Sequence, residues 1–265
     1  MSTTPTVPGT APTSRPASTG SSARTGSAGL VVPSRFCGPP SSANGGWTAG
    51  AVAELLRPHR DDVRSWSNVE VTLTAPPPLD TELSTTEEDG GLVVRHADLV
   101  VARARLVTDD LVAVPPVPAA RARAASAAYP GHTTHPFPGC FVCGPEHETG
   151  LRIFPGPIER PGPRWWAATW TPGSGESPDV PVTWAALDCI GGWAGDLAER
   201  TMVLGRMTAR VTALPRPGEE HVLVAEARGQ EGRKVHAATS LYDAAGSLLA
   251  TAEQVWIVLD PAPDA

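Results

Sequence analysis

The sequence is poor in several features that mark particular classes of protein. Lys234 is the only lysine, the other basic residues are arginines, and the net charge is −7. An acidic chain of this kind is a poor candidate for nucleic-acid binding. No apolar run reaches the roughly 18 residues that a membrane helix needs, and the N-terminus lacks the apolar core of a signal peptide. The sequence therefore predicts a cytoplasmic protein that binds neither nucleic acid nor membranes.

Cysteine is also scarce, with four residues in a chain of 265, and this excludes a disulfide framework. Two of the four form a CxxC pair, Cys140 and Cys143, and Cys37 and Cys189 lie far from it in the sequence. Three nearby histidines complete a conceivable set of zinc ligands: His132, His135 and His147. Because no second CxxC supports a metal, a structural loop without metal is favoured. Purified protein is then expected to carry substoichiometric zinc.

Residues 1–29 consist of Ser, Thr, Pro, Gly and Ala with scattered arginines and almost no large apolar residue. Such a segment cannot bury enough surface to offset the entropy lost on ordering, so a disordered tail is predicted. A mitochondrial-type transit peptide is the alternative, although the apolar face that it needs is missing.

The strongest helical pattern lies at residues 181–200, where apolar residues recur with the spacing of one helix face. Asp188 lies in the most apolar part of this stretch. Two adjacent glycines, Gly191 and Gly192, each weaken a helix by roughly 1 kcal/mol. We therefore expect another part of the chain to approach them closely.

A second helix is predicted to begin at Ser42 or Asn44 and to end before Pro58. Alternating apolar residues between turn-forming clusters predict strands at 69–74, 80–87, 92–96, 99–107, 151–154, 165–170, 207–213, 221–228, 233–242 and 247–258. A Pro/Ala/Arg-rich segment at 116–137 is predicted to link two halves, residues 30–115 and 138–260. Each half has a loop, a helix containing a Gly-Gly-Trp and four strands, which favours an internal duplication over chance alternation.

The run CFVCGPEHETGLRIF, residues 140–154, resembles the CFxCGxxNPxGL opening of hotdog-fold acyl-CoA thioesterases of the phenylacetate-pathway type. The resemblance covers residues 140–259 directly and residues 35–107 more weakly. It implies an α+β double hotdog: two antiparallel sheets, each wrapped around a long central helix and joined edge to edge. It also implies an acyl-CoA or another acyl thioester as substrate, no cofactor, and a homo-oligomer of double hotdogs as a possible assembly.

The active-site motif of this family is a His-Gly-Gly at the start of the helix, with an acidic residue nine positions after the His. In the second half Asp188 stands at the acidic position, but Val180 and Pro181 replace the glycines. In the first half Asn44-Gly45-Gly46 replaces His-Gly-Gly, and Ala53 stands at the acidic position. The two losses are complementary, so the resemblance implies one composite site made from Gly46 and Asp188.

In that site the resemblance implies Asp188 as base or nucleophile, with Asn44 and Gly46 as its catalytic partners. Backbone amides near Gly45 and Gly46 would polarise the thioester carbonyl. A one-residue shift of the helix would bring in Glu54 instead. Asp188 as a buried structural carboxylate, and Asn44 as a helix cap alone, remain open.

Four further residues are candidates for substrate binding. Trp47 and Trp193 could line an acyl pocket or belong to the core. Arg233 and Lys234 could hold the phosphates of coenzyme A or simply end a strand in solvent. The leading function is that of an acyl-CoA thioesterase. The alternative is a catalytically weak hotdog protein that binds acyl-CoA or serves as a scaffold.

Overall fold

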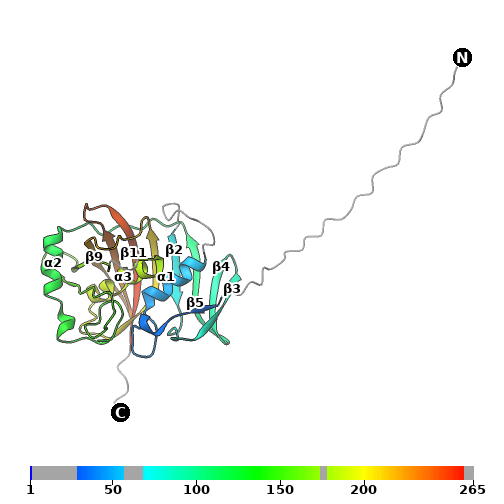
Figure 1. Ribbon diagram of the computed structural model, residues 1–265, viewed down its shortest axis with the longest axis horizontal. Helices are drawn as coiled ribbons and strands as arrows, with labels where there is room; N and C mark the ends of the chain where they lie inside the picture. Colours follow the sequence, from blue (N-terminus) through cyan, green and yellow to red (C-terminus); the bar gives the residue numbers. More distant parts are fainter. Residues whose placement is uncertain (2–28, 57–67, 174–177, 260–265) are drawn as a thin grey trace, which may run out of the picture.

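The computed structural model describes residues 1, 29–56, 68–173 and 178–259 (Figure 1). Except for Met1 and Gly29, the predicted tail at residues 1–29 lies outside the described residues. No helix in the described ranges is long and apolar enough to cross a membrane.

The described strands form a single antiparallel sheet of eleven strands, in the order β1-β3-β4-β5-β2-β8-β11-β10-β9-β7-β6. The strands are β1 (Leu30–Val31), β2 (Asn68–Leu73), β3 (Glu82–Glu88), β4 (Gly91–His96), β5 (Leu99–Val107), β6 (Gly156–Ile158), β7 (Trp165–Trp170), β8 (Met202–Val211), β9 (His221–Glu231), β10 (Lys234–Tyr242) and β11 (Leu248–Val258). The resemblance implied two sheets that are joined edge to edge, and in the structure they form one sheet. Because β2 pairs with β8, the two expected sheets are continuous.

The strands of the two halves are arranged with approximate twofold symmetry on either side of the β2–β8 pair. Moving outward from it, the first half runs β2, β5, β4, β3, β1, and the second half runs β8, β11, β10, β9, β7. In each half the strand that follows the helix, β2 or β8, lies at the centre of the sheet. The strand that precedes the helix, β1 or β7, lies farthest from the centre in the order given. The two halves of the chain thus repeat one topology, as the matched order of helix and strands in the sequence predicted.

Two helices, α1 (Gly45–Leu55) and α3 (Val180–Ala194), pack against each other on one face of the sheet (Figure 1). They run antiparallel, because Gly46 lies against Asp188 whereas Gly50 lies against Pro181. Their four-residue spacing places Gly46 and Gly50 on one face of α1, and the absence of side chains there allows the two backbones to approach. With 11 and 15 residues, neither helix is long.

Helix α3 starts where the sequence predicts but ends six residues earlier than the predicted Arg200. Its C-cap is Gly195, and Asp196 has a φ of 88°, a left-handed conformation that ends a helix. The expected close approach at the glycine pair is confirmed. A Cβ at Gly191 would lie 1.7 Å from Gln254 Oε1, and one at Gly192 would lie 2.9 Å from the Trp256 ring.

The segment predicted as a linker contains a further helix, α2 (Ala119–Ala127), which packs on the sheet. Ala122 and Ala125 are buried in a small core with Trp165 and Val224. This core lies on the face of the sheet opposite α3, because the neighbouring residues of β7 and β9 belong to the main core. The segment between the two halves is therefore folded, and its helix α2 packs on the face of the sheet opposite α3.

The prediction of a strand at 151–154 is wrong, and the next strand of the structure, β6, begins at Gly156. Arg152 has a φ of 55°, which breaks an extended run. The backbone N–H groups of Leu151 and Ile153 donate to the carbonyls of Phe141 and Val142, at 2.7 and 2.9 Å. This stretch therefore supports the CxxC loop and does not extend the sheet.

Candidate active site

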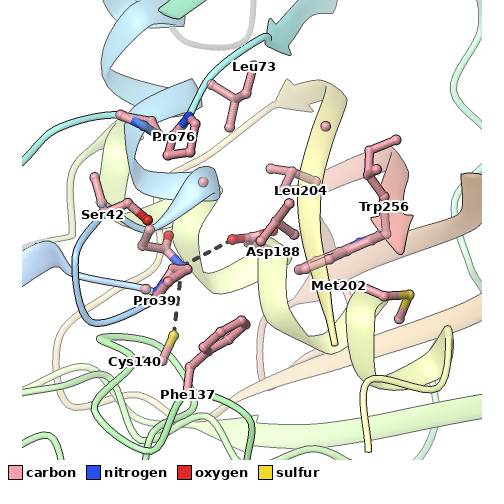
Figure 2. A pocket seen from close by; sticks show the side chains of 18 of the residues that line it. Pro39, Ser42, Leu73, Pro76, Phe137, Cys140, Asp188, Met202, Leu204 and Trp256 are labelled. Atoms are coloured by element: carbon pink, nitrogen blue, oxygen red, sulfur yellow. Dashed lines mark hydrogen bonds between the residues drawn. The ribbon is translucent and has the colours of Figure 1, made fainter. Parts of the chain in front are cut away.

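A cavity of about 420 Å³ opens beside the N-terminus of α1. Its polar lining includes Ser42, Asn44 and Asp188, and its apolar wall includes Leu73, Leu204 and Trp256. Figure 2 shows Asp188 beside Leu204 and Trp256, with Phe137 and Cys140 on another side of the cavity. One carboxylate thus faces an otherwise largely apolar space.

Asp188 projects from the middle of α3 and is 2% exposed. Its Oδ2 accepts hydrogen bonds from the Gly46 N–H at 2.9 Å and from Asn44 Nδ2 at 3.1 Å. Its Oδ1 has no hydrogen-bond partner among the described residues. Burial raises the pKa of this carboxyl to about 7, and the hydrogen bond from Gly46 opposes that rise. A carboxyl of this pKa can exchange a proton near neutral pH.

The Asn44 side chain both caps α1 and contacts Asp188. As the N-cap of α1, its side-chain oxygen accepts from the Trp47 N–H at 2.8 Å. Its Nδ2 donates to Asp188 and lies 3.9 Å from the sulfurs of both Cys140 and Cys189. The capping role predicted from the sequence is confirmed, and the same side chain also contacts the carboxylate.

The two glycines of the first turn differ in their surroundings. The N–H of Gly46 is already bonded to Asp188, and a Cβ there would lie 2.4 Å from Asp188 Cβ. Gly46 therefore lets α3 approach and holds the carboxylate in place. Gly45, the first helical residue, lines the cavity, and its N–H has no backbone or side-chain acceptor within the described part of the chain. This amide lies at the N-terminal, positive end of the helix dipole, so it can donate a hydrogen bond to an oxygen that becomes negatively charged.

The two helix caps agree with the residue count made from the sequence. Asn44 caps α1 and Asp179 caps α3, and the residues nine positions later are Ala53 and Asp188. Pro181 lies in the first turn of α3, where Gly46 lies in α1. Glu54, next to Ala53, is exposed and does not line the cavity.

The other residues predicted to bind substrate lie away from the cavity lining. Trp47 stacks on Phe36, with ring centroids 4.2 Å apart, and Trp193 packs against Tyr129 with centroids 4.8 Å apart. Both are buried. Arg233 and Lys234 are exposed at the start of β10, where Lys234 pairs in register with Ile257, a residue of the cavity lining.

Three cysteines converge at the edge of the same cavity. The sulfurs of Cys140, Cys143 and Cys189 all lie within 4.8 Å of one another, and the Cys140–Cys189 distance is 3.7 Å. Hydrogen bonds from the other two thiols, that from Cys143 first, hold the pKa of Cys140 well below its usual range. Sequence reasoning did not place Cys189 with the CxxC pair because it lies 46 positions after Cys143. Its position in α3, next to Asp188, was the available signal.

The three histidines near the CxxC pair have different contacts in the structure. His135 Nε2 lies 3.3 Å from the Cys143 sulfur. His132 packs edge-on against Tyr129, and His147 Nε2 contacts the carbonyl of Arg35 at 2.8 Å. Only His135 of the three therefore approaches a CxxC sulfur at hydrogen-bond distance within the described residues.

Comparison with known proteins finds structures of similar fold and no relative by sequence. No family model and no curated protein matches the chain. Among solved structures, a protein from Novosphingobium aromaticivorans provisionally assigned as a thioesterase is 15% identical, with a TM-score of 0.60 over 88% of this chain and 95% of its own. A conserved hotdog-fold protein from Alicyclobacillus acidocaldarius is 16% identical, with a TM-score of 0.56 over 87% and 92%.

An acyl-CoA thioesterase II from Mycobacterium marinum is 13% identical, with a TM-score of 0.54 over 84% of this chain and 92% of its own. At these identities the likeness concerns the fold alone. Together with the repeated topology of the two halves, it defines a double hotdog contained in one polypeptide.

Proposed function

We propose that this protein hydrolyses acyl thioesters, with acyl-CoA as the substrate class. The observation that carries the proposal is the Asp188 carboxylate, which lines an apolar cavity beside the start of α1 and has one oxygen anchored by hydrogen bonds and the other buried without a partner. Several structures of similar fold bear thioesterase names, among them the acyl-CoA thioesterase II from Mycobacterium marinum. These names are consistent with the chemistry that the residues offer.

The acyl chain would occupy the apolar part of the cavity beside Leu204 and Trp256. The thioester carbonyl would turn its oxygen toward the Gly45 N–H, which stabilises the oxyanion of the tetrahedral intermediate. The unpaired Oδ1 of Asp188 would take a proton from the attacking water. The C–S bond then breaks, the departing thiolate receives that proton, and the products are a carboxylic acid and a free thiol.

The roles of Gly46 and Asn44 in this scheme are to hold Asp188. Both donate to Oδ2, so they fix the carboxylate and leave Oδ1 for the water. Direct attack of Oδ1 on the carbonyl, with an anhydride intermediate, is the other reaction that this position allows. Arg233 and Lys234 are proposed to bind the phosphates of coenzyme A, because Lys234 pairs with Ile257 of the cavity lining.

One observation favours a second candidate, an acyl-CoA-binding protein with little hydrolysis. The Gly46 N–H, which corresponds to a glycine of the family motif, is already bonded to Asp188 and does not face the cavity. If the single remaining amide of Gly45 is insufficient, acyl-CoA would bind without rapid cleavage.

The test is thiol release from a panel of short, branched, aromatic and long-chain acyl-CoAs. Asp188→Asn should lower the rate by about 10²–10⁴-fold, because it keeps the shape of the side chain and removes the base. Glu54→Gln is the matched control, since it removes an exposed carboxylate from α1 next to the equivalent position of the other half. Full activity of Asp188→Asn on the best substrate would refute the assignment of the base. Wild-type protein that binds acyl-CoA and hydrolyses none of the panel would establish the second candidate.

A further inference from the structure

The three converging sulfurs come from two separate parts of the fold. Cys140 and Cys143 lie in one tight turn, closed by the Gly144 N–H donating to the Cys140 carbonyl at 2.9 Å. The Tyr129 hydroxyl donates to the Cys143 carbonyl at 2.8 Å and so supports this turn. Cys189 is fixed independently by α3, in which it is 5% exposed. Three thiols brought together by a rigid helix and a braced turn form a built site.

Their spacing is that of a thiolate metal site. Sulfurs bound tetrahedrally at about 2.3 Å from a zinc ion lie about 3.8 Å from one another. The Cys140–Cys189 distance is 3.7 Å, and no sulfur of the three is more than 4.8 Å from another. Small rotations of the cysteine side chains are enough to place all three around one ion.

We propose that Cys140, Cys143 and Cys189 bind one zinc ion at the edge of the candidate active-site cavity, with the fourth coordination position facing that cavity. All three cysteines line the cavity together with Asp188 and Asn44. Among the described residues, no further His, Cys, Asp or Glu belongs to this group. The fourth ligand is therefore a water or an atom of a bound molecule, as in zinc sites that keep an open position.

His135 supports the site as a hydrogen-bond donor and is not a fourth ligand. Its Nδ1 accepts from the Phe137 N–H at 2.8 Å, so the ring proton of the neutral imidazole is on Nε2. Nε2 lies 3.3 Å from the Cys143 sulfur and donates to it. Such donors to the metal-bound sulfurs orient the ligands of a metal site.

The charges also fit zinc. Binding releases the three thiol protons, and three thiolates with a divalent cation leave a net charge of −1. The N–H groups of His135 and Asn44 face these sulfurs, Asn44 at 3.9 Å from both Cys140 and Cys189. Soft thiolate ligands select zinc over magnesium or calcium. The sequence favoured a metal-free loop because no second CxxC supports a metal, and Cys189 now supplies a third thiol beside the single CxxC pair.

Metal analysis of a Cys37→Ser chain tests the proposal, because its only remaining thiols are the three of the site. We expect about one zinc per chain, as in wild type, since the Cys37 thiol donates a hydrogen bond to the Gly139 carbonyl and is outside the group. Added Cys143→Ser or Cys189→Ser substitutions should each remove most of the zinc. Cobalt replacing the zinc should give intense thiolate-to-metal absorption in the Cys37→Ser chain and lose part of it in the serine variants.

Because a variant of buried cysteines can fail to fold, a second measurement uses the folded Cys37→Ser chain directly. A mercurial reagent should release the zinc, detected with a coloured chelator, in proportion to the modification of three thiols. Asp188→Asn should keep its zinc whether or not the wild type hydrolyses thioesters, so the metal site and the proposed function can fail separately.

Three results would overturn the proposal. One is purified protein with only trace zinc and no thiolate-to-cobalt absorption on titration with cobalt. Another is zinc retained in full by both serine variants. The third is a mass lower by two hydrogens under non-reducing conditions, which would show a disulfide in place of three thiolates.

Discussion

The contact between Gly46 and Asp188 allows a sharp test of how the two helices determine the site. A Cβ at position 46 would lie 2.4 Å from Asp188 Cβ and 2.9 Å from the Trp184 carbonyl oxygen. Carbon atoms in contact are normally about 3.5–4.0 Å apart. In Gly46→Ala the two helices must therefore separate by about 1 Å, and Asp188 must move with α3.

Contacts this close put the cost of overpacking in the upper part of its typical range, at about 2–3 kcal/mol, and the better helix propensity of alanine returns about 1 kcal/mol. We expect a net loss of about 1–2 kcal/mol in the free energy of unfolding. For a chain of this size that corresponds to a fall in Tm of about 2–8 °C. Displacing a catalytic group by about 1 Å can cost about 10²-fold in rate. Hydrolysis by Gly46→Ala should therefore fall by about 10–10²-fold.

Gly50→Ala is the matched control, because it crowds the same helix pair one turn away from Asp188. Its Cβ would lie 2.7 Å from Pro181 Cα and 2.8 Å from Trp184 Cβ. We expect a similar loss of stability with a nearly unchanged rate. Thermal unfolding and thiol release measured on the same samples separate the two effects. Equal losses of activity in both variants would refute the view that Gly46 positions Asp188, and wild-type stability of both would refute the tight helix crossing itself.

Three further predictions concern single contacts. Asn44→Asp keeps a good helix cap but removes a hydrogen bond to the carboxylate, so circular dichroism should be unchanged while hydrolysis falls by about 10–10²-fold, and full activity would contradict this. Gly191→Ala would place its Cβ 1.7 Å from Gln254 Oε1 and break the bonds of Gln254 to Trp256 and Leu187, so urea unfolding should show a loss of about 2–5 kcal/mol. Gly139→Ala, where a Cβ meets nothing within 4 Å, should lose far less. Tyr129→Phe removes the hydroxyl that donates to the Cys143 carbonyl and should cost about 1 kcal/mol, so an unchanged Tm would argue against this support of the turn.

The parts of the fold that the sequence predicted are those set by local pattern. The alternation of residues predicted β9, β10 and β11 because these strands are long and buried on at least one face, which makes a period of two visible. The cap at Asn44 was predicted from its residue type and position. The glycine pair Gly191-Gly192 indicated a close approach, although its partners, Gln254 and Trp256, were not predictable from spacing.

The parts that sequence reasoning missed depend on contacts between distant segments. Cys189 joins Cys140 and Cys143 only because α3 and the CxxC loop meet in space, and no spacing rule connects them. The same holds for Gly50, whose importance arises from Pro181 on another helix. Helix α2 was read as a linker because its alanines and arginines give little amphipathic contrast, whereas the surface that buries Ala122 and Ala125 belongs to β7 and β9.

The β2–β8 seam and the α1–α3 crossing have the character of a subunit interface that lies within one chain. In two separate chains, such an interface would dissociate on dilution, and its stability would depend on protein concentration. Here a covalent connection makes the meeting of the two halves an intramolecular step, with an effective local concentration that no dilution changes. A site that takes Gly46 from one half and Asp188 from the other should therefore stay assembled at the lowest concentrations that an enzyme assay can use.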